Sequence, residues 1–197
     1  MTTDELRPGT SRMIREESDA VQNDPGIFRR VLGRFGTGVT VLTTRGTDGV
    51  HGMTANAFMS GSLYPPLVVV SVGQCTKFHE LVMANGRMGI SVLAADQADY
   101  SRLFAGQLRD KLAPAFEFPR EIPVVAGALA TIATEIHDTH ACGDHTLIVG
   151  KVRHVSYREG TPLLVFCGNY EGLALPIINS PCLAADRWEL DQMACAW

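Results

Sequence analysis

The residues from Gly52 to Leu67 combine side chains that can do chemistry with glycines that allow close approach. This segment reads GMTANAFMSGSLYPPL and places hydroxyls and one amide between two apolar runs of β type. Backbone N–H groups and hydroxyls can hydrogen-bond the edge of a ring that carries carbonyl and imino groups. The segment therefore predicts one wall of a site for a flat polar ligand. The pattern leaves a second interpretation open, a polar turn whose groups satisfy only one another.

Two further polar corners lie outside this segment. Thr76 and Lys77 open a predicted helix directly after a buried strand, and His145 follows Gly143 and Asp144 at the start of another strand. A helix N-terminus offers unpaired N–H groups and positive potential, to which a lysine adds a full charge, so a phosphate can bind there. An ordinary threonine cap with a solvated lysine explains Thr76 and Lys77 equally well.

A cluster of histidines, a cysteine and an aspartate raises the question of a metal site. Its members are His137, His140, Cys142, Asp144 and His145. His137 and His140 are three residues apart, which places them on opposite faces of an extended strand, and there is no second ligand cluster with finger-like spacing. We therefore expect solvated turn histidines and no metal.

Other catalytic classes lack their motifs. The chain has no G-x-S-x-G elbow, and Cys142 near His145 has no convincing third partner, which disfavours a hydrolase. It also has neither a P-loop nor a G-x-G-x-x-G run that opens a helix after a strand. A nicotinamide cofactor would have to bind in some other way.

Composition excludes several partners. With 197 residues, 46% hydrophobic and 19% charged, the chain suits one globular domain with a sizeable core. A net charge of −4 and the absence of a dense Lys/Arg run argue against nucleic acid. The longest nearly apolar window, 122–133, contains Pro123 and Gly127 and is shorter than the roughly 20 residues that span a membrane.

The beginning of the chain and its cysteines predict a cytoplasmic protein. Residues 1–23 are polar and lack the basic start and apolar centre of a secretory signal. The five cysteines are odd in number and widely spaced, which favours reduced, buried thiols over a disulfide framework. They are Cys75, Cys142, Cys167, Cys182 and Cys195.

Periodicity predicts a mainly β chain with a few helices. Asp24 and Pro25 begin an amphipathic helix that runs to about Arg34, and the strand at 66–72 is β-branched and expected to be buried on both faces. The other expected helices are 76–84 and 96–104, and the other strands are 39–44, 50–54, 88–93, 128–137, 146–157 and 163–167. An ordered loop is expected at 106–121. Strands that do not alternate regularly with helices favour an antiparallel β-barrel over a doubly wound sheet.

From about Phe28 to Tyr170 the chain resembles the flavin reductase family, whose members supply reduced flavin to two-component monooxygenases. The resemblance rests on motifs that occur in the family's order: FRRVLGRF at 28–35, GVTVLTT at 38–44, GMTAN at 52–56, SGSL at 60–63, PPLV at 65–68, FAG at 104–106, GDH at 143–145 and GNY at 168–170. Ser91 and Ala57 depart from it, because many relatives carry Asn and Ser there.

The resemblance implies an FMN-binding split barrel of Greek-key topology that forms a homodimer, with flavin near the subunit interface and nicotinamide over its ring. The barrel domain would span 24–172. Residues 1–23 have no apolar period and are expected to form a mobile arm or a frayed helix, and the extension at 173–197, outside the family motifs, is expected to pack on the domain or on the partner. The cofactors would be FMN or FAD, with NADH or NADPH as the hydride donor. The partner would be a flavin-dependent monooxygenase, without nucleic acid or membrane.

The same resemblance implies roles for individual residues. His145 would be catalytic and face the nicotinamide, and it could orient the carboxamide or relay a proton. The cofactor-binding set would be Met53, Thr54, Ala55 and Asn56 at the ring edge, Ser60 and Ser62 on the ribityl and phosphate side, Thr76, Lys77 and Arg87 at the phosphate, and Tyr170. Alternatives are a non-catalytic flavin- or haem-binding protein of the same fold, an oxidase of phosphorylated pyridoxamine, and a purely structural dimeric barrel.

Overall fold

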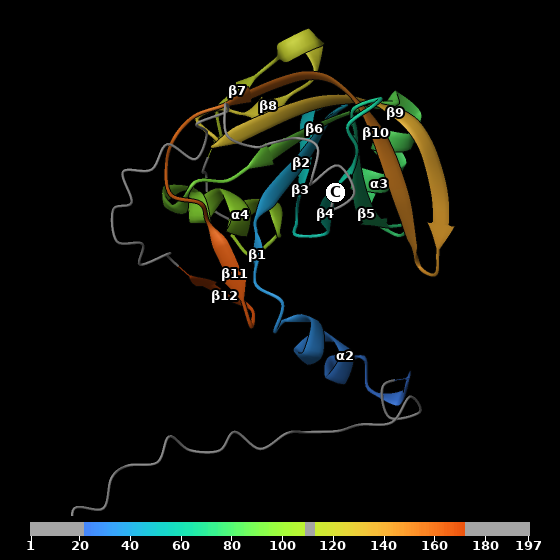
Figure 1. The fold of residues 1–197 in the computed structure, drawn as a ribbon, viewed down its shortest axis with the longest axis vertical. Helices are drawn as coiled ribbons and strands as arrows, with labels where there is room; N and C mark the ends of the chain where they lie inside the picture. The colour runs from blue at the N-terminus through green and yellow to red at the C-terminus, as the bar shows by residue number, and fades with distance from the viewer. Residues whose placement is uncertain (1–21, 109–112, 172–197) are drawn as a thin grey trace, which may run out of the picture. The chain divides into compact units, whose positions relative to one another are not determined.

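The structure is a computed structural model that describes residues 22–108 and 113–171 (Figure 1). The predicted arm at 1–23 and extension at 173–197 therefore lie almost entirely outside the described residues. Contacts divide the chain into two units, Met1–Phe35 and Gly36–Trp197, which are described separately.

The first unit contains helix α2 (Pro25–Leu32). The Asp24 side chain caps it by accepting a hydrogen bond from the Gly26 N–H at 2.8 Å, and Pro25 occupies the first helical position, as predicted. The helix ends at Leu32 and Gly33, slightly before the predicted Arg34. Its apolar side chains Phe28 and Val31 are 52% and 63% exposed.

The second unit is built around a seven-stranded sheet in the order β3-β2-β6-β9-β10-β5-β4, in which all pairs are antiparallel. These strands are β2 (Thr40–Gly46), β3 (Gly49–Ala55), β4 (Phe58–Ser62), β5 (Leu67–Gly73), β6 (Arg87–Val92), β9 (Ala130–Cys142) and β10 (His145–Tyr157). The two edge strands, β3 and β4, are consecutive in the chain and joined only by Asn56 and Ala57. Such a short link forces the sheet to curl back on itself, so it forms the predicted β-barrel (Figure 1).

Smaller elements surround this sheet. Strands β1 (Thr37–Gly38), β11 (Leu164–Phe166) and β12 (Asn169–Glu171) form a three-stranded sheet, and β7 (Phe116–Glu117) pairs with β8 (Val124–Val125). The helices are α3 (Lys77–Asn85) and α4 (Ala98–Phe104), with 3₁₀ turns η1 (Ala95–Gln97) and η2 (Pro119–Glu121). No helix within the described ranges is long and apolar enough to cross a membrane.

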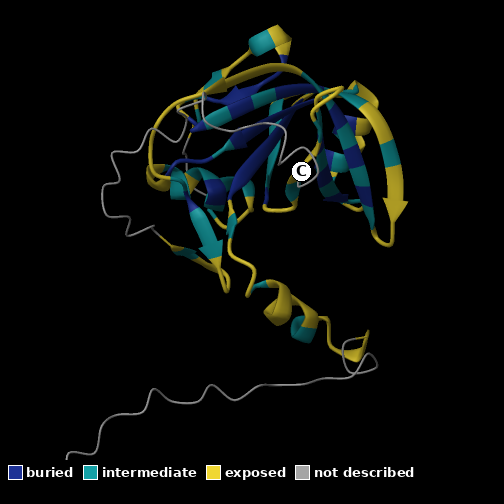
Figure 2. Ribbon diagram, viewed as in Figure 1, coloured by how far each residue is buried: buried dark blue, intermediate teal, exposed yellow. Residues whose placement is uncertain are grey.

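Two apolar clusters lie on opposite faces of the sheet. The first gathers Leu42 with side chains of β5 and β6 and with Phe78 and Val82 of α3. The second gathers Val41 with Leu93 and residues of α4, β11 and β12. Because Val41 and Leu42 are adjacent in β2 and point to opposite faces, this strand is buried on both sides (Figure 2).

Four predictions about elements and thiols were wrong. Burial on both faces belongs to β2, whereas β5 alternates between buried and half-buried residues. The segment 58–62, expected as part of a turn, is strand β4, because its backbone pairs with β5. The expected loop at 106–121 contains β7 and η2. The thiols of Cys75, Cys142 and Cys167 are exposed rather than buried, and Cys182 and Cys195 lie outside the described residues.

Candidate functional site

The end of β5 and the start of β10 bring together residues from two of the predicted polar corners. His145 pairs across the sheet with Gly73, three residues before Thr76. A Cβ added at Gly73 would lie 3.5 Å from the Thr76 side chain and 3.7 Å from the His145 Nε2. Because Gly73 has no side chain, the space between the His145 imidazole and the start of α3 stays open.

The imidazole of His145 is held by its neighbour. Its Nδ1 lies 2.7 Å from the Asp144 Oδ1, and Gln74 donates from Nε2 to the backbone carbonyl of His145 at 3.0 Å. The hydrogen bond from His145, and then its charge, lower the pKa of the Asp144 carboxyl. When Nδ1–H donates to this carboxylate, the Nε2 of the neutral ring is an acceptor. His145 is therefore oriented to accept a hydrogen bond or a proton at Nε2.

At the start of α3 the side chains already have partners. The Thr76 hydroxyl donates to the Gly73 carbonyl at 2.8 Å and accepts from the His79 N–H at 3.1 Å. The Lys77 ammonium contacts both carboxylate oxygens of Glu80, at 2.9 and 2.8 Å. Of the first-turn N–H groups, that of His79 is taken by the Thr76 cap, whereas those of Lys77 and Phe78 have no intrahelical acceptor. An anion here would thus meet main-chain donors and would compete with Glu80 for Lys77.

At the end of β3 most side chains have structural roles. Met53 and Ala55 pack into the cluster around Leu42, and the Thr54 hydroxyl donates to the Ser101 carbonyl of α4 at 2.6 Å. Only Asn56 is exposed among residues 53–56. A ligand lying against this strand would therefore contact its main chain and the Asn56 amide.

The two serines of β4 lie at the other end of β5. Ser60 pairs with Val68 and Ser62 with Leu67, whereas Thr76 and Lys77 follow Gly73. Six residues of strand separate Leu67 from Gly73, which is about 20 Å. Within one chain the structure does not bring the serines next to the start of α3.

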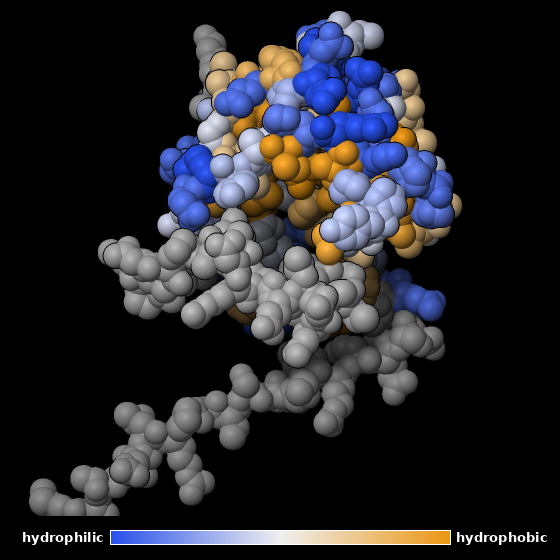
Figure 3. Space-filling view, turned by 45° about the horizontal axis from the view of Figure 1, so that its top comes forward, coloured by the Kyte–Doolittle hydropathy of each residue, from blue (hydrophilic) through white to orange (hydrophobic). Residues whose placement is uncertain are grey.

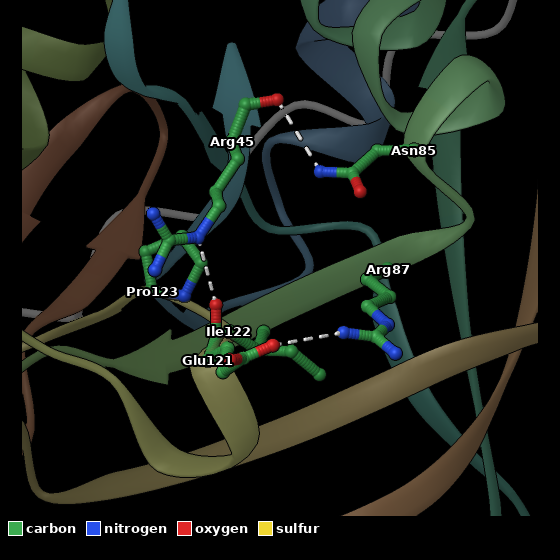
Figure 4. A pocket seen from close by; sticks show the side chains of 6 residues that line it. All are labelled: Arg45, Asn85, Arg87, Glu121, Ile122 and Pro123. Atoms are coloured by element: carbon green, nitrogen blue, oxygen red, sulfur yellow. Dashed lines mark hydrogen bonds and ion pairs between the residues drawn. The ribbon is translucent and has the colours of Figure 1, made fainter.

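Arg87 lies beyond the opposite end of α3, about 13 Å along the helix from its start. Its guanidinium is 3.6 Å from the Glu121 carboxylate and 3.9 Å from that of Glu135. It borders a cavity of about 60 Å³ (Figure 4). The lining residues are Arg45, Asn85, Arg87, Glu121, Ile122 and Pro123. Arg87 is therefore separated from Thr76 and Lys77 and already faces two carboxylates.

Two buried serines, Ser101 and Ser91, form hydrogen bonds that hold elements together, and the sequence did not predict these bonds. The Ser101 hydroxyl lies 2.8 Å from the Tyr170 hydroxyl, so Tyr170 is tied to α4. The Ser91 hydroxyl accepts from the Val125 N–H at 2.9 Å and fixes β8 on β6. No spacing rule reveals either bond, because both partners are distant in the chain. Within the ranges that the structure describes, no three His, Cys, Asp or Glu side chains are grouped to hold a metal ion.

Comparison with known proteins decides the family. Residues 32–174 match the family described as flavin reductase like domain. The chain belongs to the flavin reductase family. The match spans the barrel, the start of α3 and the His145 corner, so the whole candidate site lies within it.

Relatives of this flavin reductase family member cover most of its length. An NADH-dependent flavin reductase from a Rhodococcus species is 43% identical over 151 residues, which are 75% of this chain and 86% of the relative. The NADH-dependent flavin reductase StyB of Pseudomonas fluorescens is 36% identical over 170 residues, 84% of this chain and 99% of StyB. The structure of flavin reductase PheA2 in its native state superposes with a TM-score of 0.75 at 43% identity, and covers 77% of this chain and 99% of PheA2. The fold prediction is thereby confirmed.

Proposed function

We propose that this chain is an NADH-dependent flavin reductase that reduces FMN or FAD and supplies the reduced flavin to a monooxygenase. The family match over residues 32–174 carries the proposal. We propose NADH rather than NADPH as the hydride donor, since both relatives named above are NADH-dependent. The exposed Asn56, the open first turn of α3 and the oriented His145 fit a ligand that has a polar ring and a phosphate.

In this proposal the flavin, when bound, accepts a hydride from the nicotinamide, which is chemistry that belongs to the two cofactors. The chain binds and orients them. The main chain of residues 53–55 and the Asn56 amide hydrogen-bond the polar ring edge, and Ser60 and Ser62 bind hydroxyl groups of the ribityl chain. Lys77 and the first-turn N–H groups of α3 bind phosphate. His145 holds the nicotinamide carboxamide through Nε2.

We further propose that the chain acts as a homodimer in the cytoplasm. The separation of Ser60 and Ser62 from Lys77 supports two subunits that contribute to one binding region. Large apolar side chains also reach the surface of the described residues, as Figure 3 shows for one face. Tyr64 is 93% exposed and Tyr157 is 70% exposed, and we propose that a second copy of the chain covers them. The free thiols of Cys75, Cys142 and Cys167 suit a reducing compartment.

An anaerobic assay tests the catalytic proposal. Purified protein is mixed with NADH and either FMN or FAD, and the nicotinamide and flavin absorbances are followed together. We expect NADH to be consumed in equal amount to the flavin reduced, with NADPH much slower. Flavin binding without NADH oxidation would instead support the non-catalytic alternative, and a lack of flavin binding would refute both.

Supply to a partner is tested by adding the flavin-dependent oxygenase component of a characterised two-component monooxygenase in air. Product should form only with NADH, flavin and this protein together. A control with chemically reduced flavin shows whether the oxygenase is competent. If that control gives product and the coupled reaction does not, the proposed supply of reduced flavin is wrong.

A further inference from the structure

The end of β3 is fastened to α4 by two contacts. The Thr54 hydroxyl donates to the Ser101 carbonyl at 2.6 Å. Two residues earlier, Gly52 packs against the ring of Phe104, so closely that an added Cβ would lie 2.8 Å from two ring atoms. α4 therefore supports the end of β3 directly before Asn56, in addition to the pairing of this strand with β2.

Ser101 is itself fixed by Tyr170. Ser101 is fully buried, and its hydroxyl lies 2.8 Å from the Tyr170 hydroxyl of β12. The Arg102 guanidinium stacks over the Tyr170 ring at 5.1 Å and bonds Asp99 at 2.8 Å, which holds the ring in place. A buried hydroxyl that loses its partner is costly, so this pair favours one arrangement of α4 against β12.

We infer that Ser101 and Tyr170 are positioning residues for flavin binding, an inference that rests on the proposed function. They act through Thr54 rather than by touching the flavin. The side chains of Met53 and Ala55 are held in the core, and pairing with β2 holds the main chain as far as Ala55, whose carbonyl accepts from the Thr40 hydroxyl at 2.6 Å. The contact between Thr54 and α4 adds a second support to this strand end. Loosening that contact displaces the main-chain groups of residues 53–55 and the Asn56 amide from the ring edge.

The test compares Ser101→Ala, Tyr170→Phe and the double variant. Each single change removes one partner of the same hydrogen bond, which is worth about 1 kcal/mol, so the flavin Kd should rise about fivefold. The double variant should bind flavin no more weakly than either single variant, because the bond is lost only once and no hydroxyl of the pair is left without its partner. For Ser101→Ala, the kcat at saturating flavin should stay within about twofold of the wild type, since Ser101 is fully buried and no reacting group is removed.

Ser156→Ala is the matched control. The Ser156 hydroxyl lies 2.7 Å from the Thr131 hydroxyl on β9, so the change also deletes one serine from a hydroxyl pair, but it does so far along β10 from the His145 corner. Flavin fluorescence quenching gives the Kd, and thermal unfolding reports stability for each variant. We expect the control to bind flavin as the wild type does.

The outcomes separate this inference from the proposed function. If the wild type neither binds nor reduces flavin, the proposed function fails and the inference falls with it. If the wild type is active and Ser101→Ala and Tyr170→Phe retain its Kd, the inference alone is wrong. An equal rise in Kd for Ser156→Ala would also refute it, because the effect would then follow general stability.

Discussion

His145 is the residue on which the nicotinamide side of the proposal depends. Replacing it by alanine removes the Nε2 acceptor beside Gly73 but leaves β5 and α3 intact. We expect kcat/KM for NADH to fall about tenfold, the effect of one lost hydrogen bond in a binding site, with the flavin Kd unchanged. Stopped-flow reduction of bound flavin measures this. His154→Ala, an exposed position on β10, serves as control, and equal kinetics for all three proteins would remove His145 from the mechanism.

Asp144 gives a pH prediction. The hydrogen bond and charge of His145 lower the pKa of this carboxyl, so its contribution to stability is present above the ordinary aspartate pKa and is lost as the pH falls through the lowered value. The contribution is small, because the carboxylate is exposed. Carbon-detected NMR should find the Asp144 pKa below the ordinary value in the wild type and returned to it in His145→Ala. The same pKa in both proteins would show that the pair does not form in solution.

Residue roles were the part least accessible from the sequence. The GDH and GMTAN motifs pointed to His145 and to residues 53–56. They did not show that the Met53 and Ala55 side chains belong to the core, or that Thr54 bonds α4. Nor did they place Arg87 beside Glu121, because each of these partners comes from another part of the chain.

At the scale of elements, the close packing of β6 against the segment that leads into β8 requires a glycine at position 89. A Cβ at Gly89 would overlap the carbonyl oxygen of Pro123 and lie 2.6 Å from the Thr43 hydroxyl, which donates to that carbonyl. We expect Gly89→Ala to lower the free energy of unfolding by about 3 kcal/mol, because the main chain at Pro123 would have to move within a packed core to make room for the methyl group. Urea denaturation measures it.

The control for this prediction is Gly38→Ala in β1, where nothing lies within 4 Å of the added Cβ. It should change stability by less than about 1 kcal/mol. Similar effects at both glycines would mean that the Pro123 contact is not formed in solution.

Elements with local signals were predicted well. Thr76 caps α3, as the sequence indicated, and Gly86 ends the helix in the left-handed conformation. The strands expected at 39–44 and 50–54 are β2 and β3, which pair as a hairpin. Strand β4 was missed because Ser60, Gly61 and Ser62 give it the composition of a turn, and only pairing with β5 makes this segment a strand.

At the scale of the whole molecule, we predict a dimer in solution. Light scattering after gel filtration should give twice the chain mass of 21.3 kDa. The proposed interface is tested at Tyr64 and Tyr157, which are 93% and 70% exposed. Replacing both by Lys should weaken the dimer at micromolar concentration. A wild-type protein with the mass of one chain would contradict the proposed dimer.

The sequence by itself determined the family, the mainly β class and the helix ends, because motifs, caps and β-branched runs act over a few neighbouring residues. Tertiary structure alone decided which strand is buried on both faces, that His145 meets Gly73, and that Thr54, Ser101 and Tyr170 form one hydrogen-bonded group. These relations join residues 47 to 72 positions apart. The pairing of β5 with β10 and the contacts of α4 with β3 and β12 bring these residues together, and no local preference of the chain records such long-range contacts.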